Sequence, residues 1–201
     1  MFGQWSLVNM ETIRVATWID APVERCFLLS LSIDLHVASV RVTRKKVKGR
    51  VITGLITEGE TVTLRGRPFG VLGHTSRIDQ MRPYTYFRDV MIAGPFRHFV
   101  HEHHFAAMDD GTRIRDEIRF SSRWGPLGRI LARKRLKAFL MERGAVIKRV
   151  AESDEWRRYL DTETESGTAA TFVKGATAPR WNGNTLLRSA HQIAVPRPPR
   201  G

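Results

Sequence analysis

The fold is decided by residues 78–131, which read IDQMRPYTYFRDV (78–90), MIAGPFRHFVHEHHFAAMDDGTRIRDEIRFSS (91–122) and RWGPLGRIL (123–131). Alternating polar and apolar residues, typical of strands, run through the turn at Asp109-Asp110-Gly111 into a second strand. A long basic helix then begins near Pro126. This order predicts a sheet that wraps around a helix and leaves a cavity between them. With no catalytic motif inside the stretch, it favours binding of a small apolar molecule over any particular reaction.

The same reasoning places the other elements and makes the chain an α+β protein. A strand is predicted over 13–19, a helix over about 22–30 and a weaker helix over about 31–40. Further strands are expected over 55–64, 69–81, 84–92, 97–107 and 112–122. Short connections that contain proline, glycine or aspartate separate these strands and favour antiparallel neighbours. The final helix runs from about 126 to near 159, with a break expected at Gly144 or Ser153.

The length of 201 residues fits one domain and a tail. We expect the domain over 10–160, after a loose N-terminal extension over 1–9; whether translation starts at Met1 or Met10 stays open. Residues 161–201 are rich in Thr, Ser, Gly, Ala and Pro, so they cannot bury enough apolar surface to offset the entropy of ordering. We therefore predict a disordered tail there.

The chain is strongly basic, with a formal net charge of +13 and an isoelectric point near 10.9. Residues 41–50 and the final helix carry dense runs of Lys and Arg. Such charge permits contact with nucleic acid or membrane headgroups, but it is also typical of exposed loops and edge strands. Because the run 41–50 contains no aromatic residue for base stacking, no specific nucleic-acid partner is predicted.

The remaining composition points to a reducing compartment. The one cysteine, Cys26, cannot form a disulfide within the chain and is expected to fill space in the core. No run of apolar residues is long enough to span a membrane, and the first ten residues do not resemble a signal peptide. We expect a cytoplasmic protein.

The order of elements, together with a set of short motifs, resembles the SRPBCC (START-like) superfamily of polyketide cyclase/dehydrase and lipid-transport-like proteins, and in particular its small bacterial members. The likeness covers about 12–152 and rests on Ile19-Asp20-Ala21-Pro22-Val23-Glu24-Arg25-Cys26-Phe27, Phe69-Gly70, Ile78, Pro83, Phe87-Arg88-Asp89, Gly94-Pro95-Phe96, His101, His103, Phe105, Gly111-Thr112, Asp116, Gly125-Pro126-Leu127-Gly128 and Arg143. It implies a helix-grip fold, in which an antiparallel sheet of about seven strands curves around the C-terminal helix and encloses a deep apolar cavity. Members bind lipids, sterols, polyketides or hydrophobic hormones, and some catalyse cyclisation or hydrolysis, so the fold does not decide the activity.

The histidines of 97–105 are the main candidates for chemistry. Strand alternation puts His101 and His103 on one face, where they could bond a ligand or act as acid or base near neutral pH. If Ala107 faces Thr112 across the turn, His103 faces Asp116, whose carboxylate would fix the imidazole tautomer. These two histidines could also reach one metal ion, with a third ligand from Asp89 or Asp116, but no metal or other cofactor is expected.

The predicted function is binding of a small hydrophobic molecule, such as a lipid or polyketide, between the sheet and the final helix. The expected lining residues are Phe87, Met91, Phe99, His101, His103, Ile118, Phe139 and Leu140. An enzyme of the cyclase, aromatase or hydrolase type, using His101, His103 and Asp116, is the first alternative. A binder of anionic surfaces is the second. Ligand identity, oligomeric state and the role of the tail stay open.

Overall fold

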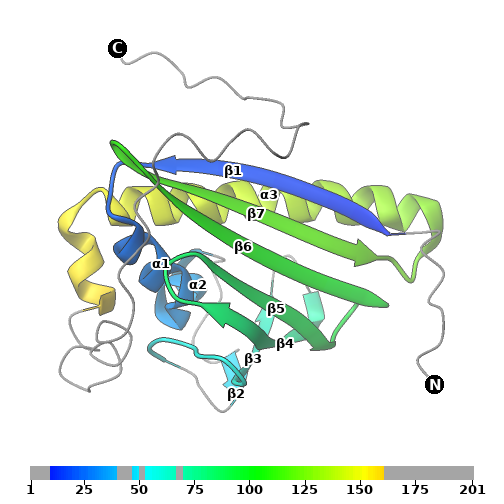
Figure 1. The fold of residues 1–201 in the computed structure, drawn as a ribbon. Coiled ribbons are helices and arrows are strands. Elements are labelled where there is room, and N and C mark those ends of the chain that lie inside the picture. Colours follow the sequence, from blue (N-terminus) through cyan, green and yellow to red (C-terminus); the bar gives the residue numbers. More distant parts are fainter. Residues whose placement is uncertain (1–9, 40–46, 50–52, 67–69, 161–201) are drawn as a thin grey trace.

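A computed structural model describes residues 10–39, 47–49, 53–66 and 70–160 of the chain. Its strands form one antiparallel sheet of seven strands in the order β1-β7-β6-β5-β4-β3-β2. Figure 1 shows this sheet curving around the long helix α3 (Gly125–Ala151), with α1 (Val23–Leu31) and α2 (Ile33–Ser39) beside it. The predicted α+β helix-grip arrangement is therefore confirmed.

Short turns join β4 to β5, β5 to β6 and β6 to β7, whereas β1 is connected to the rest of the sheet through α1 and α2. Their bounds are β1 Glu11–Ile19, β2 Val47–Gly49, β3 Thr61–Gly66, β4 Gly70–Arg82, β5 Tyr86–Ala93, β6 His98–Met108 and β7 Gly111–Ser121. The tightest turn joins β6 to β7 through Asp109 and Asp110, with Met108 opposite Gly111. Gly111 has a φ of 141°, and a Cβ on it would lie 2.2 Å from the carbonyl oxygen of Ile19, so only glycine fits there.

The helices close the open side of the sheet. Pro22 precedes α1, where a residue without a backbone N–H costs no helical hydrogen bond. Helix α3 packs on β1 and contacts α1 and α2. It ends at Ala151, and the short 3-10 helix η3 (Asp154–Trp156) follows after the cap residue Ser153. The break expected at Gly144 or Ser153 therefore occurs at Ser153, and Gly144 lies inside the helix.

One strand prediction is wrong at its beginning. The strand expected over 55–64 starts only at Thr61, because Leu55 forms an isolated bridge with Ser32 and a turn around Gly59 (φ 85°) separates the two. Leu55 is instead buried in the core beside α1 and α2. The predicted extension 1–9, most of the basic run 41–50 and the predicted tail 161–201 lie outside the described residues, so these stay predictions.

The core consists of two apolar clusters under the concave face of the sheet. The first lies around α1, α2 and the end of α3 and includes Phe27, Phe105 and Ile147. The second lies between the sheet and the first half of α3 and includes Phe99 and Leu140. Cys26 is fully buried in the first cluster, and burial raises the pKa of its thiol to about 11, so it fills space there as an uncharged group.

Candidate functional site

The sheet register brings four titratable residues to one place on its concave face. Asp89 of β5 lies opposite His101 of β6, and His103 lies opposite Asp116 of β7. The alternation predicted from the sequence holds, because His101 and His103 are buried and the residues between and after them are partly exposed. The predicted pairing of Ala107 with Thr112 is confirmed, and with it the pairing of His103 with Asp116.

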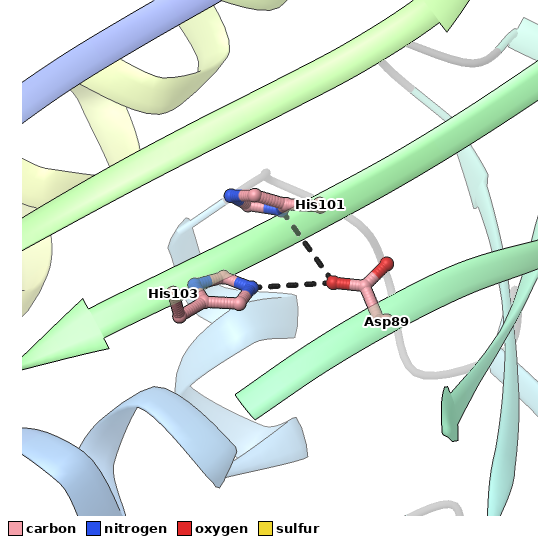
Figure 2. Close-up of side chains that lie close together, drawn as sticks. All are labelled: Asp89, His101 and His103. Atoms are coloured by element: carbon pink, nitrogen blue, oxygen red, sulfur yellow. Dashed lines mark hydrogen bonds and ion pairs between the residues drawn. The ribbon is translucent and has the colours of Figure 1, made fainter. Parts of the chain in front are cut away.

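Each histidine of this cluster lies between the two carboxylates. His101 Nε2 donates a hydrogen bond of 3.0 Å to Asp116 Oδ1, and its Nδ1 lies 3.5 Å from Asp89 Oδ2. His103 Nε2 lies 3.2 Å from Asp89 Oδ2, and its Nδ1 lies 2.8 Å from Asp116 Oδ1. Figure 2 shows both rings turned toward the Asp89 carboxylate. The two rings also face one another, with centroids 3.8 Å apart.

A second layer of polar side chains surrounds these four. Arg143 of α3 places Nη1 3.4 Å from Asp116 Oδ1 and donates from Nη2 to the carbonyl oxygen of Ser30. On the other side, Ser76 donates to Asp89 Oδ1 at 3.0 Å. His74 Nε2 lies 2.7 Å from the Ser76 hydroxyl. The carboxylates are therefore held from outside the cluster, and Asp89 Oδ2 faces the histidines.

The polar cluster separates the two apolar clusters of the core. On three of its elements, a buried residue of one apolar cluster lies on one side of the polar residues and a buried residue of the other cluster lies on the other side. These flanking pairs are Phe99 and Phe105 for the histidines, Ile118 and Ile114 for Asp116, and Leu140 and Ile147 for Arg143. Burying charged groups in such a layer costs several kcal/mol per ion before partners compensate for it. Such layers are more common at functional sites than in ordinary cores.

The environment shifts the ionisation of these groups. Burial alone would raise the pKa of Asp116, but the bonds from His101 and His103 and the charge of Arg143 hold that pKa well below its usual value. The pKa of Asp89 is also lowered, because its bond to His103 and the nearby His101 outweigh its burial. Burial lowers the pKa of His101. Both carboxylates are therefore charged at neutral pH, and the Arg143 guanidinium supplies one positive charge beside Asp116.

The cluster forms one wall of a cavity of about 80 Å³ under the sheet. Its other walls come from α1, α2, α3 and the strands β3 to β6. The lining residues are Ser30, Leu31, Ser32, Ile33, His36, Ile56, Val62, Leu64, His74, Ser76, Ile78, Phe87, Asp89, Phe99, His101, His103, Phe139 and Arg143. The cavity is much smaller than the deep apolar space that the resemblance implied, since typical ligand pockets measure about 300–1,000 Å³.

Five of the eight predicted lining residues contact this cavity: Phe87, Phe99, His101, His103 and Phe139. The other three, Met91, Ile118 and Leu140, do not. Ile118 and Leu140 are completely buried because sheet and helix pack directly on one another at that level. Met91 packs on the edge of the same cluster. Asp116 does not line the cavity: it accepts a hydrogen bond from His101 and lies 2.8 Å from His103 Nδ1, on the side of the rings away from Asp89.

Two histidines of the lining were not expected. His74 of β4 is buried, and His36 of α2 is partly buried with its Nε2 out of contact with solvent. The burial of the two rings lowers the pKa of His36 to about 3 and that of His74 to about 4. The position of His74 could have been predicted from the sequence, because His74, Ser76 and Ile78 are two residues apart and therefore lie on one face of β4. No comparable signal marks His36, which reaches the cavity only through the packing of α2.

Comparison with solved structures shows the same fold in proteins with little sequence similarity. The di-domain ARO/CYC StfQ from the steffimycin biosynthetic pathway matches with a TM-score of 0.57 and 12% identity, over 72% of this chain and 52% of that protein. The di-domain ARO/CYC BexL from the BE-7585A biosynthetic pathway matches with a TM-score of 0.58 and 16% identity, over 72% and 51%. The chain therefore shares the fold of these two ARO/CYC proteins. It spans about half the length of these two proteins.

A protein that is matched over almost its full length has the same fold. Protein CV1439 from Chromobacterium violaceum matches with a TM-score of 0.51 and 13% identity, over 71% of this chain and 97% of that protein. No model of a known family and no curated protein matches the chain. The superfamily resemblance noted in the sequence is thus supported at the level of the fold.

The remaining surface features concern partners. Among the helices of the described residues, none combines the length and the apolar character needed to cross a bilayer. Helix α3 exposes basic side chains together with Leu127, Ile130 and Leu131 near its beginning. Contact with an anionic surface through this helix or through residues 41–50 stays a prediction.

Proposed function

We propose that this protein binds one small, uncharged molecule with an apolar body of about one ring and a hydroxyl group. The observation that supports this proposal is the buried cluster of Asp89, His101 and His103, which forms the polar end of a cavity with otherwise largely apolar walls. A few convergent polar groups in an apolar pocket are typical of small-molecule sites. The shared fold with proteins named as ARO/CYC agrees with ligand binding at this place.

The size of the cavity limits the ligand. A water molecule needs roughly 10–15 Å³ of such space, so 80 Å³ corresponds to about five to eight water molecules. A single ring with one or two substituents is of this size, whereas a lipid or a polyketide chain would require the walls to move apart. Burial of about 150 Å² of apolar surface contributes about 4 kcal/mol. With one hydrogen bond to a charged group, worth about 1.5–3 kcal/mol, we expect a Kd on the order of 10–100 μM.

The charge of the site selects the head group. Asp89 and Asp116 carry two negative charges, and Arg143 supplies one positive charge that is already directed at Asp116. A carboxylate on the ligand would therefore add a like charge in a buried place. A hydroxyl group can donate to Asp89 Oδ2 and accept from a histidine N–H, so a phenol or an alcohol fits the cluster better than an acid does.

Isothermal titration calorimetry with p-cresol, toluene and 4-methylbenzoate tests this proposal. We expect p-cresol to bind, toluene to bind about tenfold more weakly because it lacks the hydrogen bond, and 4-methylbenzoate not to bind. The variant His103→Asn should weaken p-cresol binding. His104→Asn is the matched control, because His104 lies on the opposite face of the same strand. Equal binding of p-cresol and 4-methylbenzoate, absence of binding, or an equal loss in both variants would contradict the proposal.

The second candidate function is acid–base catalysis on a small carbonyl compound. It is favoured by the convergence of His101 and His103 on the cavity, with Asp116 Oδ1 within 3.0 Å of a ring nitrogen of each. In this arrangement an imidazole could remove a proton next to a carbonyl group. Deuterium exchange of the methyl protons of acetophenone, followed by NMR, tests it: we expect acceleration that is lost in His101→Asn and His103→Asn. Exchange at the rate of buffer alone would rule it out.

A further inference from the structure

Three potential metal ligands of the described residues converge in the cavity wall. The atoms that Asp89, His101 and His103 can offer to an ion lie within 4.8 Å of one another (Figure 2). They come from two adjacent strands whose register places them side by side. We propose that these three side chains form a binding site for one divalent transition-metal ion, with Zn²⁺ as the representative. This site does not depend on the proposed organic ligand.

The distances between the atoms suit such an ion. Asp89 Oδ2 lies 3.2 Å from His103 Nε2 and 3.5 Å from His101 Nδ1. A tetrahedral Zn²⁺ ion with bonds of about 2.0–2.1 Å separates its ligand atoms by about 3.3–3.4 Å. Two imidazoles and one carboxylate are donors that first-row transition metals prefer, whereas Mg²⁺ and Ca²⁺ prefer oxygen ligands. The sequence left the third ligand open between Asp89 and Asp116, and the structure assigns it to Asp89.

The surroundings orient these ligands in the way known metal sites do. A histidine that binds a metal commonly donates its other ring N–H to a carboxylate. Here Asp116 Oδ1 lies 3.0 Å from His101 Nε2 and 2.8 Å from His103 Nδ1, which are the nitrogens that face away from Asp89. Ser76 donates to Asp89 Oδ1 and leaves Oδ2 directed at the two rings.

The number of protons on the ring nitrogens of His101 and His103 also favours a metal ion at this place. Two neutral imidazoles carry one N–H each, while four of their ring nitrogens face carboxylate oxygens. Without an ion, His103 Nε2 donates to Asp89 Oδ2, and His103 Nδ1 has no hydrogen-bond partner among the described residues although it lies 2.8 Å from Asp116 Oδ1. With the His103 proton moved to Nδ1, two nitrogen lone pairs and Asp89 Oδ2 face one another. A cation among these three atoms replaces repulsion by attraction. The adjoining cavity leaves room for water in the fourth position, as in metal sites that keep an open coordination position.

The test uses the full chain after dialysis against a chelator. We expect calorimetry to show one Zn²⁺ ion per chain, Co²⁺ to produce visible d–d absorption bands, and Mg²⁺ to give neither signal. Asp89→Asn and His103→Asn should weaken Zn²⁺ binding at least tenfold. Asp116→Asn should weaken it by about 10–100-fold, since it orients the histidines. The double variant His98→Asn/His104→Asn, on the opposite face of the strand, should bind as the unchanged protein does.

A second measurement guards against variants that fold poorly. Zn²⁺ should raise the melting temperature of the unchanged protein and of the His98/His104 control, but not that of a folded Asp89→Asn variant. Absence of Zn²⁺ binding to the unchanged protein would overturn the proposal. So would binding that is lost in the control or retained in Asp89→Asn and His103→Asn. Because the probe is the metal alone and the protein has been freed of metal, a failure of Zn²⁺ binding would leave the proposal of p-cresol binding unchanged.

Discussion

Mild acid should destabilise this protein, because histidines are buried around the cavity in their neutral form. The pKa values of His36 and His74 are lowered to about 3 and about 4 by burial, from an ordinary value of 6.5. Between 6.5 and these values the unfolded chain binds protons that the folded protein does not bind. The free energy of unfolding is therefore highest above pH 6.5 and falls as the pH decreases toward 4.

The size of the effect at pH 5 follows from the same values. At pH 5 the pH is 1.5 units below the ordinary histidine pKa of 6.5 and still above the folded pKa of both residues. Each histidine therefore lowers the free energy of unfolding by about 2 kcal/mol, and the two together lower it by about 4 kcal/mol. His101 adds to this loss, since burial lowers its pKa as well. Asp89 and Asp116 add to it only below about pH 4, because their folded pKa values lie below the ordinary value of 3.8. A domain of this size has about 5–15 kcal/mol of stability in total.

Urea unfolding followed by circular dichroism at pH 7 and pH 5 measures this loss. Replacing His36 by leucine removes one of the two groups, so the loss between the two pH values should fall from about 4 to about 2 kcal/mol. This change is tolerable because His36 Nε2 is buried without a hydrogen-bond partner among the described residues. His98→Gln, at an exposed position, is the control. Equal stability at pH 7 and pH 5, or a pH dependence that His36→Leu leaves unchanged, would refute the reasoning.

Three further substitutions test the packing around the site, each followed by urea unfolding. Arg143→Met should lower the free energy of unfolding by about 3–5 kcal/mol, because Asp116 loses its buried cation. Adding Asp116→Leu should restore part of that loss. A double variant that is no more stable than Arg143→Met would contradict this. Gly144→Ala should lower the free energy of unfolding by about 1–3 kcal/mol, because its Cβ would lie 2.4 Å from Thr17 Oγ1. Adding Thr17→Ala should relieve this clash. A Gly144→Ala variant as stable as the unchanged protein would contradict this. Phe139→Ala should lower the free energy of unfolding by about 3–5 kcal/mol and enlarge the cavity. In calorimetry, 2-naphthol should then bind to the variant and not to the unchanged protein. Equal binding of 2-naphthol to both proteins would contradict this.

Much of the sheet could be predicted because its signals are local. Alternation along β6 decided which histidines face inward, and the short turn at Asp109 and Asp110 set the register that pairs His103 with Asp116. The start of β3 could not be predicted in this way. Leu55 has the composition of a strand residue but pairs with Ser32 instead, and that contact depends on the position of α2.

The cavity itself depended on packing that no local pattern shows. His36 and Arg143 reach the cavity from two helices, and their position there depends on the angle at which each helix crosses the sheet. The same holds for Ile118 and Leu140, which have the right spacing to line a cavity but meet in the core. A few side chains that fill space decide between a deep hollow and one of 80 Å³. Sequence periodicity predicts which face is buried and leaves the remaining volume undetermined.

The central claim is that Asp89, His101 and His103 form the polar end of a cavity that accepts one small ring. A crystal structure of the protein soaked with saturating p-cresol tests it most directly. We predict electron density for the ring among Phe87, Phe99 and Phe139, with the hydroxyl oxygen within hydrogen-bond distance of the cluster. A cavity that contains only side chains or water under these conditions, or a ring bound with its methyl group toward the histidines, would contradict the claim.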